Sequence, residues 1–91
     1  MPTIHWAGTG LSAVPGLRAL IRAGHQVRVY NRSVDKARAA VAGFPDVEVL
    51  AFELPVLAAA LRAGDVVVSM LPADLHVELA QLCLAHDAHF V

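Results

Sequence analysis

The chain has 91 residues, of which 57% are hydrophobic, and a formal net charge of −1 at pH 7. A chain of this length forms one small domain, near the lower size limit at which a domain can bury a core of its own. The charge gives no reason to expect nucleic acid or an anionic membrane as a partner. The single cysteine, Cys83, leaves no disulfide framework and fits a cytoplasmic protein. Glu48, Glu53 and Pro55 interrupt the longest apolar region, residues 47–61, so we expect no membrane span.

Short apolar runs alternate along the chain with segments of helical periodicity. We expect strands at Thr3–Ala7, Gln26–Tyr30, Val47–Phe52 and Asp65–Leu71, and a fifth that begins near Ala88. Helices are expected at Leu11–Ala23, at Val34–Ala42, from Pro55 to Gly64, and after Asp74. This alternation predicts a Rossmann-like α/β fold: a doubly wound parallel sheet of three layers, with strand order 3-2-1-4-5.

The expected helices carry recognisable faces and caps. In the first, the apolar residues at helical spacing are Val14, Leu17, Leu20 and Ile21. Arg18 and Arg22 then fall on the solvent-facing side. Ser33 and Asp74 precede the second and fourth helices, where their side chains can cap free N–H groups. Cys83 falls on the apolar face of the fourth helix and is expected in the core.

The first strand runs directly into Gly8-Thr9-Gly10-Leu11-Ser12-Ala13, a G-x-G-x-x-A turn that opens a helix. In a dinucleotide-binding turn, Gly8 permits the tight bend, and Gly10 lets the backbone approach a pyrophosphate. Ala13 keeps the helix close to the sheet. The first N–H groups of the helix, at the positive end of its dipole, suit a diphosphate. We therefore expect Gly8, Thr9, Gly10, Leu11 and Ser12 to bind cofactor, although an ordinary strand-to-helix turn has the same pattern.

The end of the second strand indicates which dinucleotide binds. NAD-preferring folds place an acid here for the ribose 2′-hydroxyl, whereas this chain has Asn31-Arg32-Ser33. An arginine and a hydroxyl can receive a 2′-phosphate, so we expect NADP(H) rather than NAD(H). In the alternative interpretation, Ser33 is purely a helix cap and Arg32 a solvated turn residue. Lys36 and Arg38 can add positive potential here, but are interpreted as ordinary helix surface.

The carboxyl ends of strands one and four lie where the strand order reverses, which is the ligand crevice of such folds. This places Ser69, Leu71 and Pro72 over the middle of the cofactor, unless they merely end a buried strand. His5 is expected to be a hydrogen-bonded core histidine, and His76, beside the crevice, is left open as a ligand contact. No nucleophile–base–acid set is readable, so the cofactor would supply the chemistry, and we expect the isolated chain to be catalytically silent.

Two segments, at the right separation, resemble a known family. Gly8-Thr9-Gly10-Leu11-Ser12-Ala13-Val14-Pro15 resembles the G-x-G-[FL]-x-x-x-P opening of the glutamate-forming saccharopine dehydrogenases. Asp65-Val66-Val67-Val68-Ser69-Met70-Leu71-Pro72 is similar to their D-V-V-[IV]-S-[LIM]-[LIV]-P strand, and the resemblance covers nearly the whole chain. It implies an NADP(H)-binding N-terminal domain of a homodimeric oxidoreductase of lysine metabolism, which acts on the CH–NH bond of an amino acid derivative.

The chain stops at Ala88-His89-Phe90-Val91, inside an apolar strand, so we expect residues 1–91 to be the N-terminal domain of a longer protein. Ala73 stands where the family has tyrosine, which leaves the substrate open. Leu50-Ala51-Phe52 stands where L-D-V is usual, so we expect an aspartate contact near the adenosine to be lost. One alternative is a β-hydroxyacid dehydrogenase, because residues 24–32 resemble its G-H-x-V-x-V-Y-N-R segment. Another is a dinucleotide-sensing module without catalysis.

Overall fold

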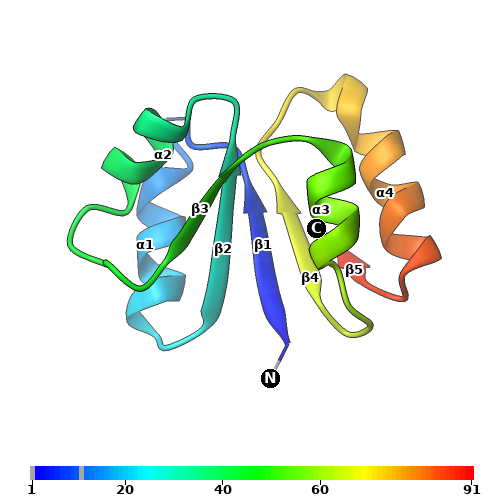
Figure 1. Cartoon of the computed structure of the whole chain (residues 1–91), viewed down its shortest axis with the longest axis horizontal. Helices are drawn as coiled ribbons and strands as arrows, with labels where there is room; N and C mark the ends of the chain where they lie inside the picture. The colour runs from blue at the N-terminus through cyan, green and yellow to red at the C-terminus, as the bar shows by residue number, and fades with distance from the viewer. Residues whose placement is uncertain (1, 11) are drawn as a thin grey trace.

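A parallel sheet forms the middle layer of the chain (Figure 1), for which a computed structural model describes residues 2–10 and 12–91. Its five strands, within those residues, are β1 (Thr3–Ala7), β2 (Gln26–Asn31), β3 (Glu48–Ala51), β4 (Val66–Ser69) and β5 (His89–Phe90). Their order is β3-β2-β1-β4-β5, which confirms the expected Rossmann-like topology. The switch point therefore lies between β1 and β4.

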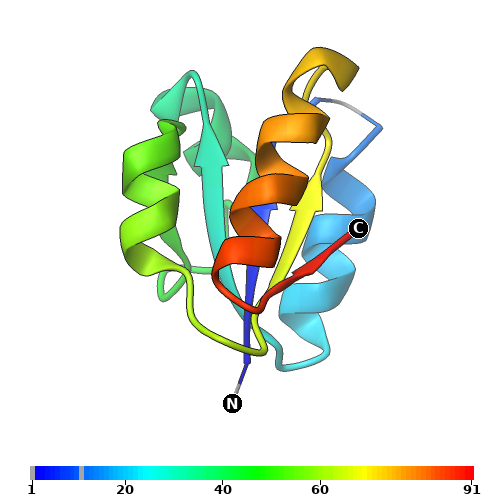
Figure 2. The same ribbon diagram turned by 90° about the vertical axis from the view of Figure 1, so that its right-hand side faces the viewer.

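Helices cover both faces of the sheet (Figures 1 and 2). One face carries α1 (Val14–Arg22) and α2 (Val34–Ala40), and the other carries α3 (Leu54–Ala60) and α4 (His76–Ala85). A short 3-10 turn, η1 (Ala73–Leu75), leads into α4. Within the described ranges, no helix has both the length and the apolar character that a membrane crossing requires.

Successive side chains of β1 pack into two separate hydrophobic cores, because neighbouring residues of a strand point to opposite faces of the sheet. Trp6 packs with Leu17 of α1 and the alanines of α2, whereas Ala7 packs with Leu57 of α3 and Leu79 of α4. These three leucines are fully buried. Each buried leucine contributes about 1.5–3 kcal/mol relative to exposure. Cys83 lies in the second core, as its place on the apolar face of the helix predicts.

The third helix ends earlier than its sequence pattern predicts. It stops at Ala60 instead of Gly64, because Leu61 adopts extended backbone and becomes buried in the core. The carboxylate of Asp65 then accepts the backbone N–H of Arg62 at 3.0 Å and holds the chain in a turn. Asp65 therefore precedes β4 instead of starting it.

Two other expectations about polar side chains are wrong. Asp74 lies inside the 3-10 turn, and Leu75 takes the N-cap position of α4. Arg18 does not simply face solvent, because its guanidinium donates to the carbonyls of Ala40 and Ala42, at 3.1 and 2.9 Å. It also lies 4.7 Å from the centre of the Phe44 ring, so it joins α1 to the end of α2.

Candidate dinucleotide-binding site

The turn after β1 depends on a glycine at its first position. Gly8 has φ +101°, a left-handed conformation that side chains with a Cβ disfavour. A Cβ here would also lie 3.0 Å from the carbonyl oxygen of Met70, just after β4. The indole Nε1–H of Trp6 donates to the Gly8 carbonyl at 2.9 Å, which fixes the orientation of that peptide.

Gly10 differs from Gly8, because the protein leaves the space beside it open. A Cβ added there would meet no described heavy atom within 4 Å beyond its immediate neighbours. The fold itself therefore does not require glycine at this position, whereas a bound group lying against the backbone would. Ala13 is buried in the core with Trp6, as its expected role between helix and sheet predicts.

On the other side of the same edge, hydrogen bonds shape the turn after β2. The side-chain amide of Asn31 donates to the Ser33 carbonyl at 2.9 Å. Ser33 is the N-cap of α2, and its hydroxyl accepts the backbone N–H of Lys36 at 3.3 Å. The cap expected from the sequence is thus confirmed. These local bonds hold the backbone of the turn in place.

A cavity of about 820 Å³ lies between the two turns, open toward solvent. Its volume is within the range of small-molecule and cofactor sites. The wall consists of the two turns and the facing sides of α1 and α2, namely Thr9, Gly10, Val14, Pro15, Asn31, Arg32, Ser33, Lys36, Ala39 and Ala40. Strand order alone brings these segments together, because β1 and β2 are neighbours whose carboxyl ends meet at one edge.

Thr9 shows that this wall fits a polar ligand. Its hydroxyl oxygen is buried, and no hydrogen-bond partner for it exists within the described ranges 2–10 and 12–91. An unpaired buried hydroxyl costs about 1–3 kcal/mol, so such groups are rare in folded proteins. At the wall of a cavity, a ligand that hydrogen-bonds to the hydroxyl relieves this cost.

Comparison with known families agrees with this geometry. Residues 4–91 match the saccharopine dehydrogenase NADP binding domain. The chain belongs to this family. No curated protein matches the sequence significantly. As the family's description states, the cofactor of the domain is NADP(H).

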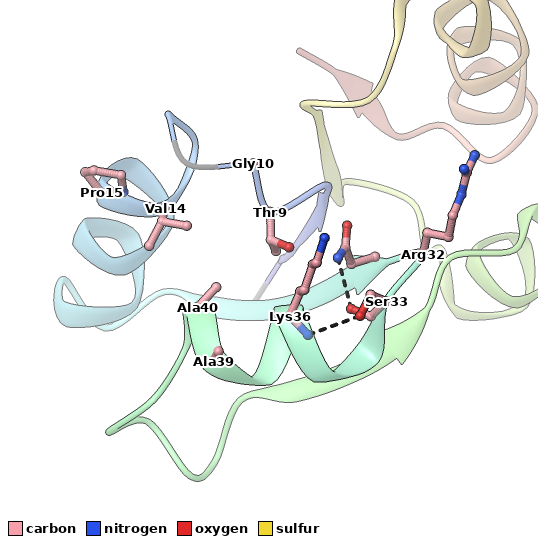
Figure 3. A pocket seen from close by; sticks show the side chains of 10 residues that line it. Thr9, Gly10, Val14, Pro15, Arg32, Ser33, Lys36, Ala39 and Ala40 are labelled. Carbon is pink, nitrogen blue, oxygen red and sulfur yellow. Dashed lines mark hydrogen bonds between the residues drawn. The ribbon is translucent and has the colours of Figure 1, made fainter.

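The two cationic side chains that line the cavity, Arg32 and Lys36, point in different directions (Figure 3). The side chain of Arg32 extends away from the glycine turn, whereas that of Lys36 extends from α2 toward Thr9. Lys36 is exposed on the helix surface, as the sequence predicts, and it also lines the cavity. The available signal is its spacing: it follows Ser33 by three residues, which places both on one face of the helix. Arg38 lies outside this cavity and lines a separate groove beside Phe44.

The remaining expected site residues that the structure describes do not line the cavity. Ser69 ends β4, and its hydroxyl accepts the backbone N–H of Leu71 at 3.3 Å. The N–H of Met70 donates to the Ala7 carbonyl at 2.8 Å, which brings this turn against Gly8 at the switch point. Pro72 and Ser12 are both exposed at this edge, and Leu11 lies outside the described residues.

Two histidines have structural partners. His76 Nε2 lies 3.1 Å from the carbonyl oxygen of Leu71, so that nitrogen carries the proton and donates. His5 is buried, with Nδ1 2.7 Å from the hydroxyl of Tyr30 and Nε2 2.8 Å from Asp65. This confirms His5 as a hydrogen-bonded core residue. In the described part of the chain, no three His, Cys, Asp or Glu residues cluster as metal ligands would.

One departure from the saccharopine dehydrogenase pattern has a clear place in the fold. Ala51, where the family's L-D-V triplet has aspartate, is paired in register with Asn31 at the ends of β3 and β2. The backbone N–H of Phe52 donates to the Asn31 carbonyl at 2.9 Å. The edge of the sheet beside the cavity therefore has a methyl group in place of a carboxylate.

Proposed function

We propose that this chain is the NADP(H)-binding domain of a saccharopine dehydrogenase-like oxidoreductase that acts on the CH–NH bond of an amino acid derivative. The observation that carries the proposal is the cavity that joins the glycine turn to the acid-free turn Asn31–Ser33. A dinucleotide laid along this edge would place its pyrophosphate over Gly10 and its adenosine ribose beside Asn31. The family match over residues 4–91 supports the same assignment.

The individual roles follow from the chemistry of the wall. Gly10 gives the pyrophosphate room beside the backbone, and the N-terminus of α1 favours its negative charge. Arg32 and Ser33 receive the 2′-phosphate, while Ser69, Leu71 and Pro72 border the nicotinamide half across the switch point. When bound, NADP(H) supplies the hydride chemistry, and the protein contributes binding and orientation.

The substrate and the assembly are inferred from the family resemblance. The amino acid derivative would bind in a further domain of a longer, homodimeric protein, because no described residue of this chain forms a catalytic set. The test is spectrophotometric: NADPH production is followed with saccharopine and NADP⁺. Turnover is expected from the parent protein and none from the 91-residue chain. Turnover by the chain alone would contradict this division of labour, and a parent that binds NADPH without turnover would not use saccharopine as its substrate.

Cofactor choice is tested by calorimetric titration of the chain with NADPH and NADH. A well-placed charge-assisted hydrogen bond contributes about 1.5–3 kcal/mol, and solvent exposure of Arg32 moves the value toward the lower end. We therefore expect Arg32→Ala to weaken NADPH binding roughly tenfold and leave NADH nearly unchanged. Arg32→Asp should invert the preference. Equal losses of affinity for NADPH and NADH would mean that Arg32 is a turn residue that does not bind the 2′-phosphate.

A further inference from the structure

Both backbone polar groups of Leu71, in the turn after β4, are bonded within the protein. Its N–H donates to the hydroxyl of Ser69 at 3.3 Å, and its carbonyl accepts from Nε2 of His76 at 3.1 Å. One residue earlier, the N–H of Met70 donates to the carbonyl of Ala7 at 2.8 Å. The backbone of this turn is therefore held by the end of its own strand, by β1 and by α4.

The bond from His76 differs from the others, because a proline follows Leu71. The peptide group between Leu71 and Pro72 has no N–H, so hydrogen bonding can fix its direction only through its carbonyl. His76 is the first residue of α4, and its side chain supplies the hydrogen bond to that carbonyl. The direction of this peptide therefore depends on the His76 side chain.

An apolar contact fixes the imidazole of His76 in turn. Its ring meets the ring of Phe90 on β5 edge-on, with the ring centroids 5.8 Å apart and the planes at 69°. The side chain is half-buried, and among the described residues it is not one that lines the cavity. A protonated Nε2 donates in both the neutral and the charged imidazole, so the bond needs no particular charge on the ring. This arrangement suits a residue that orients backbone.

We propose that His76 is a positioning residue for the nicotinamide half of NADP(H). This inference rests on the proposed function, which lays that half of the cofactor against Ser69, Leu71 and Pro72. His76 holds the Leu71–Pro72 peptide in one direction and so keeps the turn in the shape against which the cofactor packs. The imidazole acts through this peptide and does not itself contact the cofactor. Its loss should therefore weaken only those ligands that reach the switch point.

The test compares NADP⁺ with adenosine 2′,5′-bisphosphate, a probe without the nicotinamide half, in calorimetric titrations of the chain. His76→Phe keeps a ring beside Phe90 and removes the donor, whereas His76→Gln removes the ring and keeps an N–H donor. His76→Phe is expected to raise the dissociation constant for NADP⁺ about threefold to tenfold and to leave that for the bisphosphate within about twofold. His76→Gln should bind NADP⁺ within about twofold of the wild type.

The matched control is His86→Phe, because His86 is the C-cap at the opposite end of α4. It should leave both dissociation constants nearly unchanged. Equal losses for the two ligands in His76→Phe would mean a general disturbance of the domain, and unchanged NADP⁺ affinity would mean that the bond does not serve binding. A loss of NADP⁺ affinity in both His76→Phe and His76→Gln would mean that the imidazole itself contacts the cofactor. Each of these three results would overturn the proposal.

His76→Leu is a second variant without a donor, and it should show the same selective loss as His76→Phe. It replaces His76→Phe if circular dichroism shows that variant to be unfolded. Unfolding of both variants would assign the bond to the stability of the fold and overturn the proposal.

The wild-type chain separates this inference from the function beneath it. If the wild type binds neither NADP⁺ nor the bisphosphate, the proposed placement of the cofactor in the cavity fails, and the role of His76 fails with it. If the wild type binds both, and the variants without a donor bind NADP⁺ as tightly as it does, the cofactor placement stands and only the present inference is overturned.

Discussion

The imidazole of His5 donates from Nε2 to the carboxylate of Asp65 at 2.8 Å, and the two residues are 1% and 4% exposed. The same carboxylate accepts the backbone N–H groups of Thr3 and Arg62, each at 3.0 Å. Burial by itself would raise the pKa of Asp65, but the hydrogen bonds from Thr3, His5 and Arg62 outweigh it and hold the pKa below its ordinary value. Asp65 therefore joins the start of β1 to the turn before β4.

Replacing Asp65 by asparagine should lower the free energy of unfolding by about 2–4 kcal/mol at pH 7. The amide has one oxygen where the carboxylate has two, so its NH₂ group must face at least one of the three donors. Chemical denaturation monitored by circular dichroism measures the loss. Asp35→Asn, in the exposed first turn of α2, is a control that removes a carboxylate without buried partners.

The stabilising effect of Asp65 should disappear in acid. Because its folded pKa lies below the unfolded value, the carboxylate contributes fully above the unfolded pKa, and this contribution is lost as pH falls through the folded pKa. The stability gap between the wild type and Asp65→Asn should therefore be widest near neutrality and narrow below about pH 4. Denaturation curves between pH 7 and the acid limit test this, and parallel profiles for the two proteins would contradict it.

Substitution of the two glycines of the turn should affect different properties: stability at Gly8 and cofactor binding at Gly10. Gly8→Ala places a Cβ 3.0 Å from the Met70 carbonyl oxygen and forces φ +101° on an alanine, so we expect a stability loss of about 1–3 kcal/mol. Gly10→Val meets open space and should leave the unfolding midpoint nearly unchanged, yet abolish NADPH binding. If Gly10→Val retained wild-type affinity in calorimetry, Gly10 would have no part in binding the pyrophosphate.

Trp6→Phe should weaken the binding of NADPH and of NADH to a similar extent. The substitution removes the indole hydrogen bond of 2.9 Å to the Gly8 carbonyl and keeps an aromatic ring in the core. The freed peptide then samples orientations that do not support the dinucleotide, so NADPH and NADH should lose similar affinity, about threefold to tenfold. A loss confined to NADPH would place Trp6 in 2′-phosphate recognition instead, and parallel titrations of both cofactors decide between the two outcomes.

Cys83 should be unreactive in the native protein. Its side chain lies in the core at 2% exposure, and burial raises the pKa of the thiol, so little reactive thiolate forms. A chromogenic disulfide reagent should label the native chain slowly and the urea-unfolded chain quickly. The chain has one cysteine, so the signal has one source. Rapid native labelling would mean that α4 separates easily from the sheet.

Local patterns predicted much of this molecule, because strands, helix faces and the Ser33 cap depend on residues near one another in sequence. The glycine at the tight turn is of this kind, because the motif alone predicts the tight bend at Gly8. The misassigned side chains have distant partners. Arg18 contacts carbonyls beyond the next strand, and Asp65 binds Thr3, 62 residues away. For Lys36, helical spacing indicated its face, but its position opposite Thr9 depends on how two strand ends meet.

The contacts of Arg18 bear on the thermodynamics of ligand entry. By holding the carbonyls of Ala40 and Ala42 and stacking on Phe44, this side chain fixes the distance between the two helices that flank the cavity. The walls are therefore ordered by folding before any ligand arrives. A dinucleotide that enters such a preorganised cleft spends little of its interaction energy on immobilising the protein. Loosening this contact should make cofactor binding entropically less favourable even though Arg18 lies outside the cavity wall.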